Sequence, residues 1–270
     1  MQMNIAQEAA AILTRLRATR PLIHHITNSV SINDCANITL AIGASPVMAD
    51  DVQEVGEMVA VASALVLNLG MPNPRKIEAM LIAGKRAAQK GIPIVLDPVG
   101  VGATKLRMET AKRFFSEMNI SVVRGNLAEC KALLGFSGGS QGVDCILKEE
   151  YKENFAQELA QKLGCVVAIT GATDIVASGS QLCRIHNGNS LLTGITGTGC
   201  MTTSLVACFS SVNRETFIGA VAGIAAMGVA GEIAEHSLKP GEGLGTFRIR
   251  LMDAISNMKQ ETLLNRMKIS

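Results

Sequence analysis

The sequence predicts an α/β fold with a mainly parallel central sheet and helices on both of its faces. Along the first 170 residues, short and continuously apolar runs alternate with longer stretches of helical periodicity. Continuous apolar character is typical of strands buried on both faces, and helices between such strands form the right-handed crossovers of a parallel sheet. After Thr170, short apolar runs are separated by hairpin signals, which indicate some antiparallel later strands.

The expected elements follow in chain order. Apolar residues from Ile5 to Leu16 recur at helical spacing, and Pro21 separates this helix from a first strand at 22–26. Further parallel strands are predicted at 64–68, 92–97, 120–124 and 165–170, connected by helices over 74–90, 105–118 and 151–163. Three shorter strands are expected at 174–178, 181–186 and 190–194, and the chain from Gly199 onward is predicted to be almost wholly helical. Because no linker or repeat divides the chain, residues 1–270 are expected to form a single α/β domain.

Composition excludes several classes of function. The net charge is +2 and aromatic residues make up 3% of the chain, without tryptophan, so neither a basic patch nor a base-stacking platform for nucleic acid is expected. The uncharged segment from Thr216 to Gly231 is shorter than the roughly 18 to 20 residues of a membrane-spanning helix, which favours a buried helix. The seven cysteines form no CxxC pair and no signal peptide is evident, so a reducing, cytoplasmic setting is expected; they are Cys35, Cys130, Cys145, Cys165, Cys183, Cys200 and Cys208.

Polar residues follow several of the predicted strands. Asp97 ends one strand, Arg124 ends the next with Asn126 and Glu129 just behind it, and Thr170 ends a third. Ligands of parallel α/β sheets bind outside the carboxyl ends of the strands, so these residues are candidates for a site. Asp97 and Glu129 are candidate Mg²⁺ ligands, since this ion uses one or two carboxylates together with substrate phosphates.

These residues also have structural explanations. Asp97 before Pro98 could shape a turn, and Asn126 and Glu129 have the spacing of a helix capping box. Arg124 could clamp phosphate oxygens or form an ordinary salt bridge at the strand end.

The segment "TGITGTGC", residues 193–200, predicts an anion site. Its glycines allow close approach of a ligand, and the first turn of the following helix offers free N–H groups and a partial positive charge. A tight turn that simply begins a helix is the alternative. Cys200 stands in the first helical turn, where N–H groups would lower the pKa of its thiol and make it a candidate base or nucleophile; a small core residue is the alternative. Neither a Walker motif nor an early G-x-G-x-x-G is present.

Five segments together resemble the hydroxyethylthiazole kinase family of thiamine salvage. They are "HHITNSVSINDCANITLAIGASPVM" (24–48), "VLDPVGVGAT" (95–104), "VRGNLAE" (123–129), "AITGATD" (168–174) and "TGTGC" (196–200). The resemblance implies a ribokinase-like fold, a homotrimer, and use of ATP and Mg²⁺ to phosphorylate the hydroxyl of 4-methyl-5-(2-hydroxyethyl)thiazole.

The resemblance also implies roles for individual residues. Arg124 and Thr170 resemble ATP contacts, with Asn126, Thr198 and Gly199 on the phosphate side. Met48 and Gly197 resemble thiazole contacts, with Asn28 as a neighbour, while Asp97 and Glu129 match acidic residues near the metal and phosphates. Cys200 stands where the wider superfamily has an aspartate base. Our hypothesis is that Cys200 accepts or relays the proton of the alcohol, while the N–H groups of residues 197–200 stabilise the phosphoryl group.

Three other functions stay open at this point. One is a kinase of the same fold for another small alcohol, such as a hydroxymethylpyrimidine, and a second is a non-catalytic nucleotide-binding protein. The third, a hydrolase with Cys200 as nucleophile, would need a histidine partner among His24, His25, His186 and His236.

Overall fold

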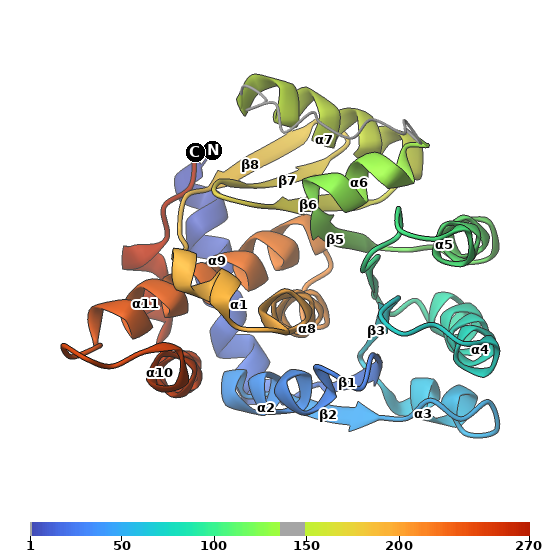
Figure 1. Ribbon diagram of the computed structural model, residues 1–270, viewed down its shortest axis with the longest axis horizontal. Helices are drawn as coiled ribbons and strands as arrows, with labels where there is room; N and C mark the ends of the chain where they lie inside the picture. The colour runs from blue at the N-terminus through green and yellow to red at the C-terminus, as the bar shows by residue number, and fades with distance from the viewer. Residues whose placement is uncertain (1, 136–148) are drawn as a thin grey trace.

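The computed structural model describes residues 2–135 and 149–270 of the chain (Figure 1). In this part of the chain, eight strands form one sheet in the order β2-β1-β3-β4-β5-β6-β7-β8. From β2 to β6 in this order, each pair of adjacent strands is parallel, whereas β7 is antiparallel to both β6 and β8, as the sequence predicted. The strands are β1 (Leu22–Ile26), β2 (Ser45–Met48), β3 (Ala64–Asn68), β4 (Ile94–Asp97), β5 (Val122–Asn126), β6 (Val166–Thr170), β7 (Asp174–Ser178) and β8 (Gln181–Ile185).

Helices cover both faces of the sheet, as Figure 1 shows. One face packs against α1 (Gln2–Thr19), α2 (Ile32–Ile42), α8 (Thr198–Ser210) and α9 (Thr216–His236), with α10 (Leu244–Ser256) and α11 (Gln260–Arg266) outside them. The other face packs against α3 (Val55–Val61), α4 (Pro74–Lys90), α5 (Lys105–Glu117), α6 (Leu127–Leu133) and α7 (Glu149–Leu163). The central strand β3 is buried at every position, which explains its continuous apolar sequence.

The structure differs from the predicted elements in one misassigned strand and in four elements that were not predicted. The predicted strand at 190–194 is a short 3₁₀ helix, η1 (Ser190–Gly194), because the Asn189 side chain accepts a hydrogen bond from the Leu191 N–H (2.9 Å) and turns the chain. The edge strand β2 was not predicted; its Pro46 lacks a backbone donor, and such a residue is tolerated where one side of a strand is unpaired. The short helices α2, α3 and α6 were also not predicted.

Helix α9 is 21 residues long, so the length argument from residues 216–231 was wrong. By length and composition α9 is the one helix among the described residues that could cross a membrane, but 89% of its most apolar window is buried inside the protein. The expectation of a buried helix is therefore confirmed. Gly223 lets α9 approach α8 closely, since a Cβ at this position would lie 2.6 Å from the backbone N of Val206. This contact fixes α8, whose first turn borders the site described next.

Candidate active site

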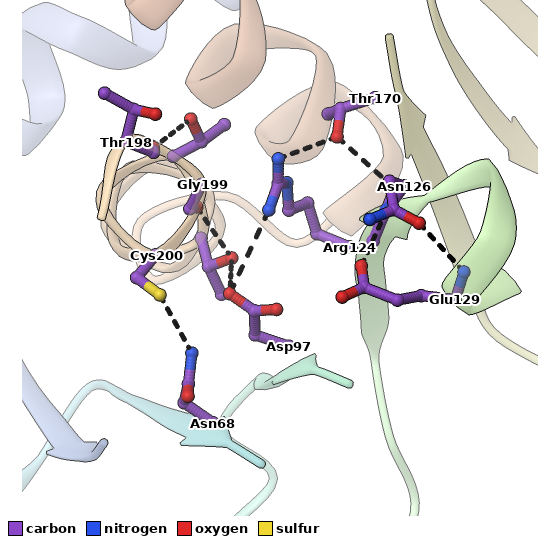
Figure 2. A network of polar contacts seen from close by, with 12 residues as sticks. Asn68, Asp97, Arg124, Asn126, Glu129, Thr170, Thr198, Gly199 and Cys200 are labelled. Atoms are coloured by element: carbon purple, nitrogen blue, oxygen red, sulfur yellow. Dashed lines mark hydrogen bonds and ion pairs between the residues drawn. The ribbon is translucent and has the colours of Figure 1, made fainter. Parts of the chain in front are cut away.

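The carboxyl ends of four neighbouring strands meet the first turn of α8. Asn68 ends β3 beside Asp97 at the end of β4, and Asn126 ends β5 beside Thr170 at the end of β6. Arg124 of β5 reaches toward the same point (Figure 2). The structure thus brings together residues far apart in the sequence, as the rule for parallel sheets predicts.

Arg124 lies between β6 and the start of α8. Its Nη2 donates to Thr170 Oγ1 (2.7 Å), and its Nη1 lies 4.0 Å from Asp97 Oδ2. The guanidinium also lies against Gly199, where a Cβ would be 2.6 Å from Nη1. A cation beside the positive end of a helix is unfavourable by itself, and the buried Nε has no partner. Both features suit an anion bound between Arg124 and α8.

A pocket of about 660 Å³ opens at this point, a volume typical of sites for drug-sized ligands. All five residues assigned to the nucleotide from the sequence line it: Arg124, Asn126, Thr170, Thr198 and Gly199. Its wall includes the apolar side chains of Leu192, Ile224 and Met227 and the loop 187–190. A pocket lined by charged and polar groups as well as apolar side chains suits a ligand with a phosphate and an aromatic ring.

Asp97 is fully buried next to this pocket. Its Oδ2 accepts a hydrogen bond from Thr203 Oγ1 (2.9 Å), whereas its Oδ1 has no partner. Burial raises the pKa of Asp97 to about 6; the charge of Arg124 opposes this shift and that of Glu129 adds to it. The carboxylate therefore has one oxygen that lacks a compensating group.

Asn126 and Glu129 form a capping box at the start of α6, as their spacing in the sequence indicated. Asn126 Oδ1 accepts from the Glu129 N–H and Glu129 Oε2 accepts from the Asn126 N–H, both at 2.9 Å. Glu129 Oε1 also accepts from the Gly100 N–H (2.9 Å). These contacts hold the carboxylate of Glu129 near that of Asp97, close enough to raise the pKa of Asp97.

Two neighbouring carboxylates fit Mg²⁺, which requires only one or two of them when substrate phosphates complete its shell. The partnerless Oδ1 of buried Asp97 is the observation that supports this fit. Within residues 2–135 and 149–270, no group of three or more His, Cys, Asp or Glu side chains could hold a metal ion without other ligands.

Cys200 lies in the first turn of α8, and its sulfur accepts hydrogen bonds from two amides. Asn68 Nδ2 lies 3.3 Å and Asn28 Nδ2 lies 3.6 Å from Sγ. The predicted lowering of the thiol pKa is wrong: burial and the charge of Asp97 raise it, and hydrogen bonds with Ser31, Asn68 and Asn28 oppose the shift only in part. Burial therefore favours the neutral thiol of Cys200 over the thiolate. Asn68 was missed from the sequence, although it ends an apolar strand as Asp97 does.

The residues assigned to the thiazole are only partly brought together. Asn28 contacts Cys200, and Gly197, with φ of 87°, is the N-cap of α8 and faces Ser31 of the loop before α2. Met48 lies at the end of edge strand β2, in register with His25 of β1. Of the apolar side chains on α2, Ile38 and Ile42 lie in the core and Leu40 is 57% exposed.

The histidines do not pair with Cys200. His24 Nε2 lies 2.8 Å from the Ala49 carbonyl oxygen, and His25 Nε2 lies 3.2 Å from Ser204 Oγ, so the two side chains point to opposite faces of the sheet. In the described part of the chain no hydrogen bond joins a histidine to Cys200. Nothing therefore supports the hydrolase alternative. Cys145, one of the seven cysteines, lies outside the described residues.

The fold is ribokinase-like, and its site brings a helix start and an arginine together beside a buried carboxylate, as suits a small-molecule kinase. The family model described as the hydroxyethylthiazole kinase family matches residues 13–261. The chain belongs to this family. A curated relative, hydroxyethylthiazole kinase of Alkaliphilus oremlandii, is 46% identical over 268 residues, covering 99% of both chains.

Solved structures agree with this assignment. The hydroxyethylthiazole kinase of Pyrococcus horikoshii superposes with a TM-score of 0.87 at 36% identity, covering 97% of this chain and 98% of that one. A ribokinase-like superfamily protein from Enterococcus faecalis has a TM-score of 0.65 at 11% identity, covering 96% of each chain. The second similarity shows the fold alone.

Proposed function

We propose that the protein transfers the γ-phosphoryl group of ATP to the hydroxyl of 4-methyl-5-(2-hydroxyethyl)thiazole, in thiamine salvage. The observation that carries this proposal is the junction at the start of α8. There, a pocket lined by Arg124, Thr170 and Gly199 lies beside a cysteine that two amides hold in place. Family membership supports both the kinase activity and the acceptor.

Arg124 and the first turn of α8 would bind the phosphates. Arg124 offers charged donors, and the N–H groups of Gly197 to Cys200 lie at the positive end of a helix, where they stabilise negative charge. Asn126 and Thr170 complete the phosphate side, with Thr198 opposite them. Asp97 and Glu129 would hold Mg²⁺, partly through water, and the bound ion would neutralise phosphate charge.

Cys200 would receive the hydroxyl of the thiazole. Because burial raises the pKa of its thiol, Cys200 is suited to relay a proton rather than to act as a preformed thiolate: the sulfur takes the proton of the alcohol while its own S–H proton passes to an oxygen of the transferred phosphoryl group. A weak base is sufficient here, because phosphoryl transfer depends mainly on alignment and on charge stabilisation. Asn28 and Gly197 would contact the thiazole on the side of α2, and Met48 would extend this surface from the edge strand.

We further infer a single-domain, cytoplasmic enzyme that assembles as a homotrimer. The free state of the six described cysteines supports a reducing compartment. Large exposed apolar side chains near α2, namely Val30, Ile32 and Leu40, support a contact between subunits. Light scattering should give three times the chain mass of 28.4 kDa. The monomer mass would contradict the trimer.

The function is tested by measuring ADP release from purified protein with ATP, Mg²⁺ and hydroxyethylthiazole. Controls omit the thiazole or replace it with hydroxymethylpyrimidine. Release that requires the thiazole is the expected result. Release that requires the pyrimidine would indicate another small-alcohol kinase, and ATP binding without release from either acceptor would indicate a non-catalytic nucleotide-binding protein.

A further inference from the structure

Asn68 is a buried side chain whose amide has one allowed orientation. Its Oδ1 accepts from Asn28 Nδ2 (2.9 Å) and from the Gly70 N–H (2.8 Å), and its Nδ2 donates to Cys200 Sγ (3.3 Å). Rotating the amide by 180° would place an NH₂ group against two donors. The NH₂ group of Asn68 must therefore face the sulfur of Cys200 (Figure 2).

Asn28 is oriented in the same way by the backbone before α2. Its Oδ1 accepts from the N–H groups of Val30 and Ser31, both at 3.0 Å, and from Ser31 Oγ (3.2 Å). Its Nδ2 is thereby directed at Asn68 Oδ1 and at Cys200 Sγ. The two amides, which we call the amide pair, meet the sulfur only as donors.

Gly70 makes room for the amide pair. A Cβ at Gly70 would lie 2.8 Å from both Asn28 Nδ2 and Asn68 Oδ1. The amide pair therefore packs directly against the backbone that follows β3, and its NH₂ groups face Cys200 in the first turn of α8. Asn68 does not line the nucleotide pocket, and its side chain contacts Asn28, Gly70 and Cys200.

We propose that Asn68 is a positioning residue for phosphoryl transfer and acts through Cys200. This inference rests on the proposed function. The N–H donors of the amide pair hold Sγ in place, and Cys200 stays partly exposed, so the hydroxyl of the acceptor would reach it there. A displacement of about 1 Å at such a position costs on the order of 10²-fold in rate, so loss of one donor has a measurable effect.

The test is Asn68→Asp, which has the same shape. One carboxylate oxygen still accepts from Asn28 and Gly70, but the other faces the sulfur of Cys200 and cannot donate a hydrogen bond to it. We expect kcat with thiazole to fall by about 10- to 100-fold, with the KM for ATP changed less than about twofold. The matched control is Asn73→Asp at the N-cap of α4, where Oδ1 accepts from the Lys76 N–H and should continue to do so. Asn68→Ser replaces the aspartate variant if the latter does not fold.

A double-mutant cycle separates positioning from a general structural role. In a Cys200→Ala background, Asn68→Asp should lower kcat by no further factor, because the group through which Asn68 acts is gone. An equal loss of kcat in both backgrounds would overturn the proposal.

A second readout does not depend on the kinase reaction. In metal-free protein without nucleotide, the rate of alkylation of Cys200 by iodoacetamide should change by about tenfold in Asn68→Asp, because a carboxylate oxygen replaces the N–H donor that holds the sulfur. Cys165, which is also partly exposed, is the internal reference. Unchanged alkylation of Cys200 would overturn the positioning role even in an active enzyme. Wild-type protein without thiazole-dependent ADP release would instead overturn the proposed function.

Discussion

Gly199→Ala is expected to weaken ATP binding without weakening the fold. The new Cβ would lie 2.6 Å from Arg124 Nη1, so the guanidinium must move by about 0.8 Å to reach the 3.4 Å of ordinary contact. Such a shift pulls Arg124 away from the place where we expect phosphate. A hydrogen bond to a charged group contributes about 1.5–3 kcal/mol, so its loss should raise the KM for ATP by roughly 10- to 150-fold.

The free energy of unfolding should stay nearly unchanged in Gly199→Ala or should rise slightly. Gly199 is a helical residue without a positive φ, and alanine is favoured over glycine by up to about 1 kcal/mol inside a helix. The atom that the Cβ meets is the end of a flexible side chain, which can retreat without moving the backbone. Thermal unfolding should therefore give a Tm equal to or above that of the wild type.

Steady-state kinetics at varied ATP concentration tests this reasoning. Gly56→Ala in α3 is the matched control, because a Cβ there meets nothing within 4 Å. In an Arg124→Ala background the additional effect of Gly199→Ala should disappear. A KM for ATP within twofold of the wild type in Gly199→Ala would refute the assignment of Arg124 and Gly199 to the phosphate site.

Four further outcomes are expected. Cys200→Ala should lower kcat by about 10²–10⁴-fold with an unchanged KM for ATP, and unaltered turnover would refute its role. Asp97→Asn should lower kcat by about 10²-fold and raise the Mg²⁺ concentration that gives the half-maximal rate, which a Mg²⁺ titration checks. Thermal unfolding should nevertheless show a higher Tm, because the substitution removes a charge that burial disfavours. Burial lowers the pKa of His25 to about 4, so the unfolded chain, whose histidine has a pKa of about 6.5, binds a proton first as the pH drops. The free energy of unfolding should therefore fall by about 3 kcal/mol between about pH 6.5 and pH 4. Urea unfolding should show a smaller fall in His25→Asn, whereas the control His236→Asn should show the same fall as the wild type. Gly223→Ala should destabilise the protein by about 2 kcal/mol or more in urea unfolding, because its Cβ would meet the backbone of α8, and an unchanged midpoint would contradict this close packing.

The parts of the fold that the sequence predicted are those whose pattern is set by burial. Strands such as 64–68 and 166–170 are covered by helices on one or both faces, so their apolar runs are continuous and easily recognised. The edge strand Ser45–Met48 is only half-buried, and its four residues carry no such pattern. The segment 190–194 is apolar enough for a strand, but the Asn189 side chain accepts a hydrogen bond from the Leu191 N–H and makes the segment a turn of helix.

The same distinction holds for the site. Asp97, Arg124 and Thr170 could be predicted as candidates because the carboxyl ends of parallel strands lie side by side, a rule that can be applied to the sequence alone. Asn68 obeys the rule equally but has no charge to draw attention, and only its contacts with Asn28 and Cys200 reveal a role.

The sequence by itself determined the α/β architecture, the placement of the candidate site at the carboxyl ends of the strands, and the family. It did so because burial patterns, strand ends and the five family segments are local properties of the chain. Only the tertiary structure decided the chemical state of Cys200. The sequence predicted a lowered pKa from the nearby helix start, but burial and the charge of Asp97, which comes from another strand, raise it. Solvation and charge at one atom depend on everything packed around it, and that environment exists only in the folded chain.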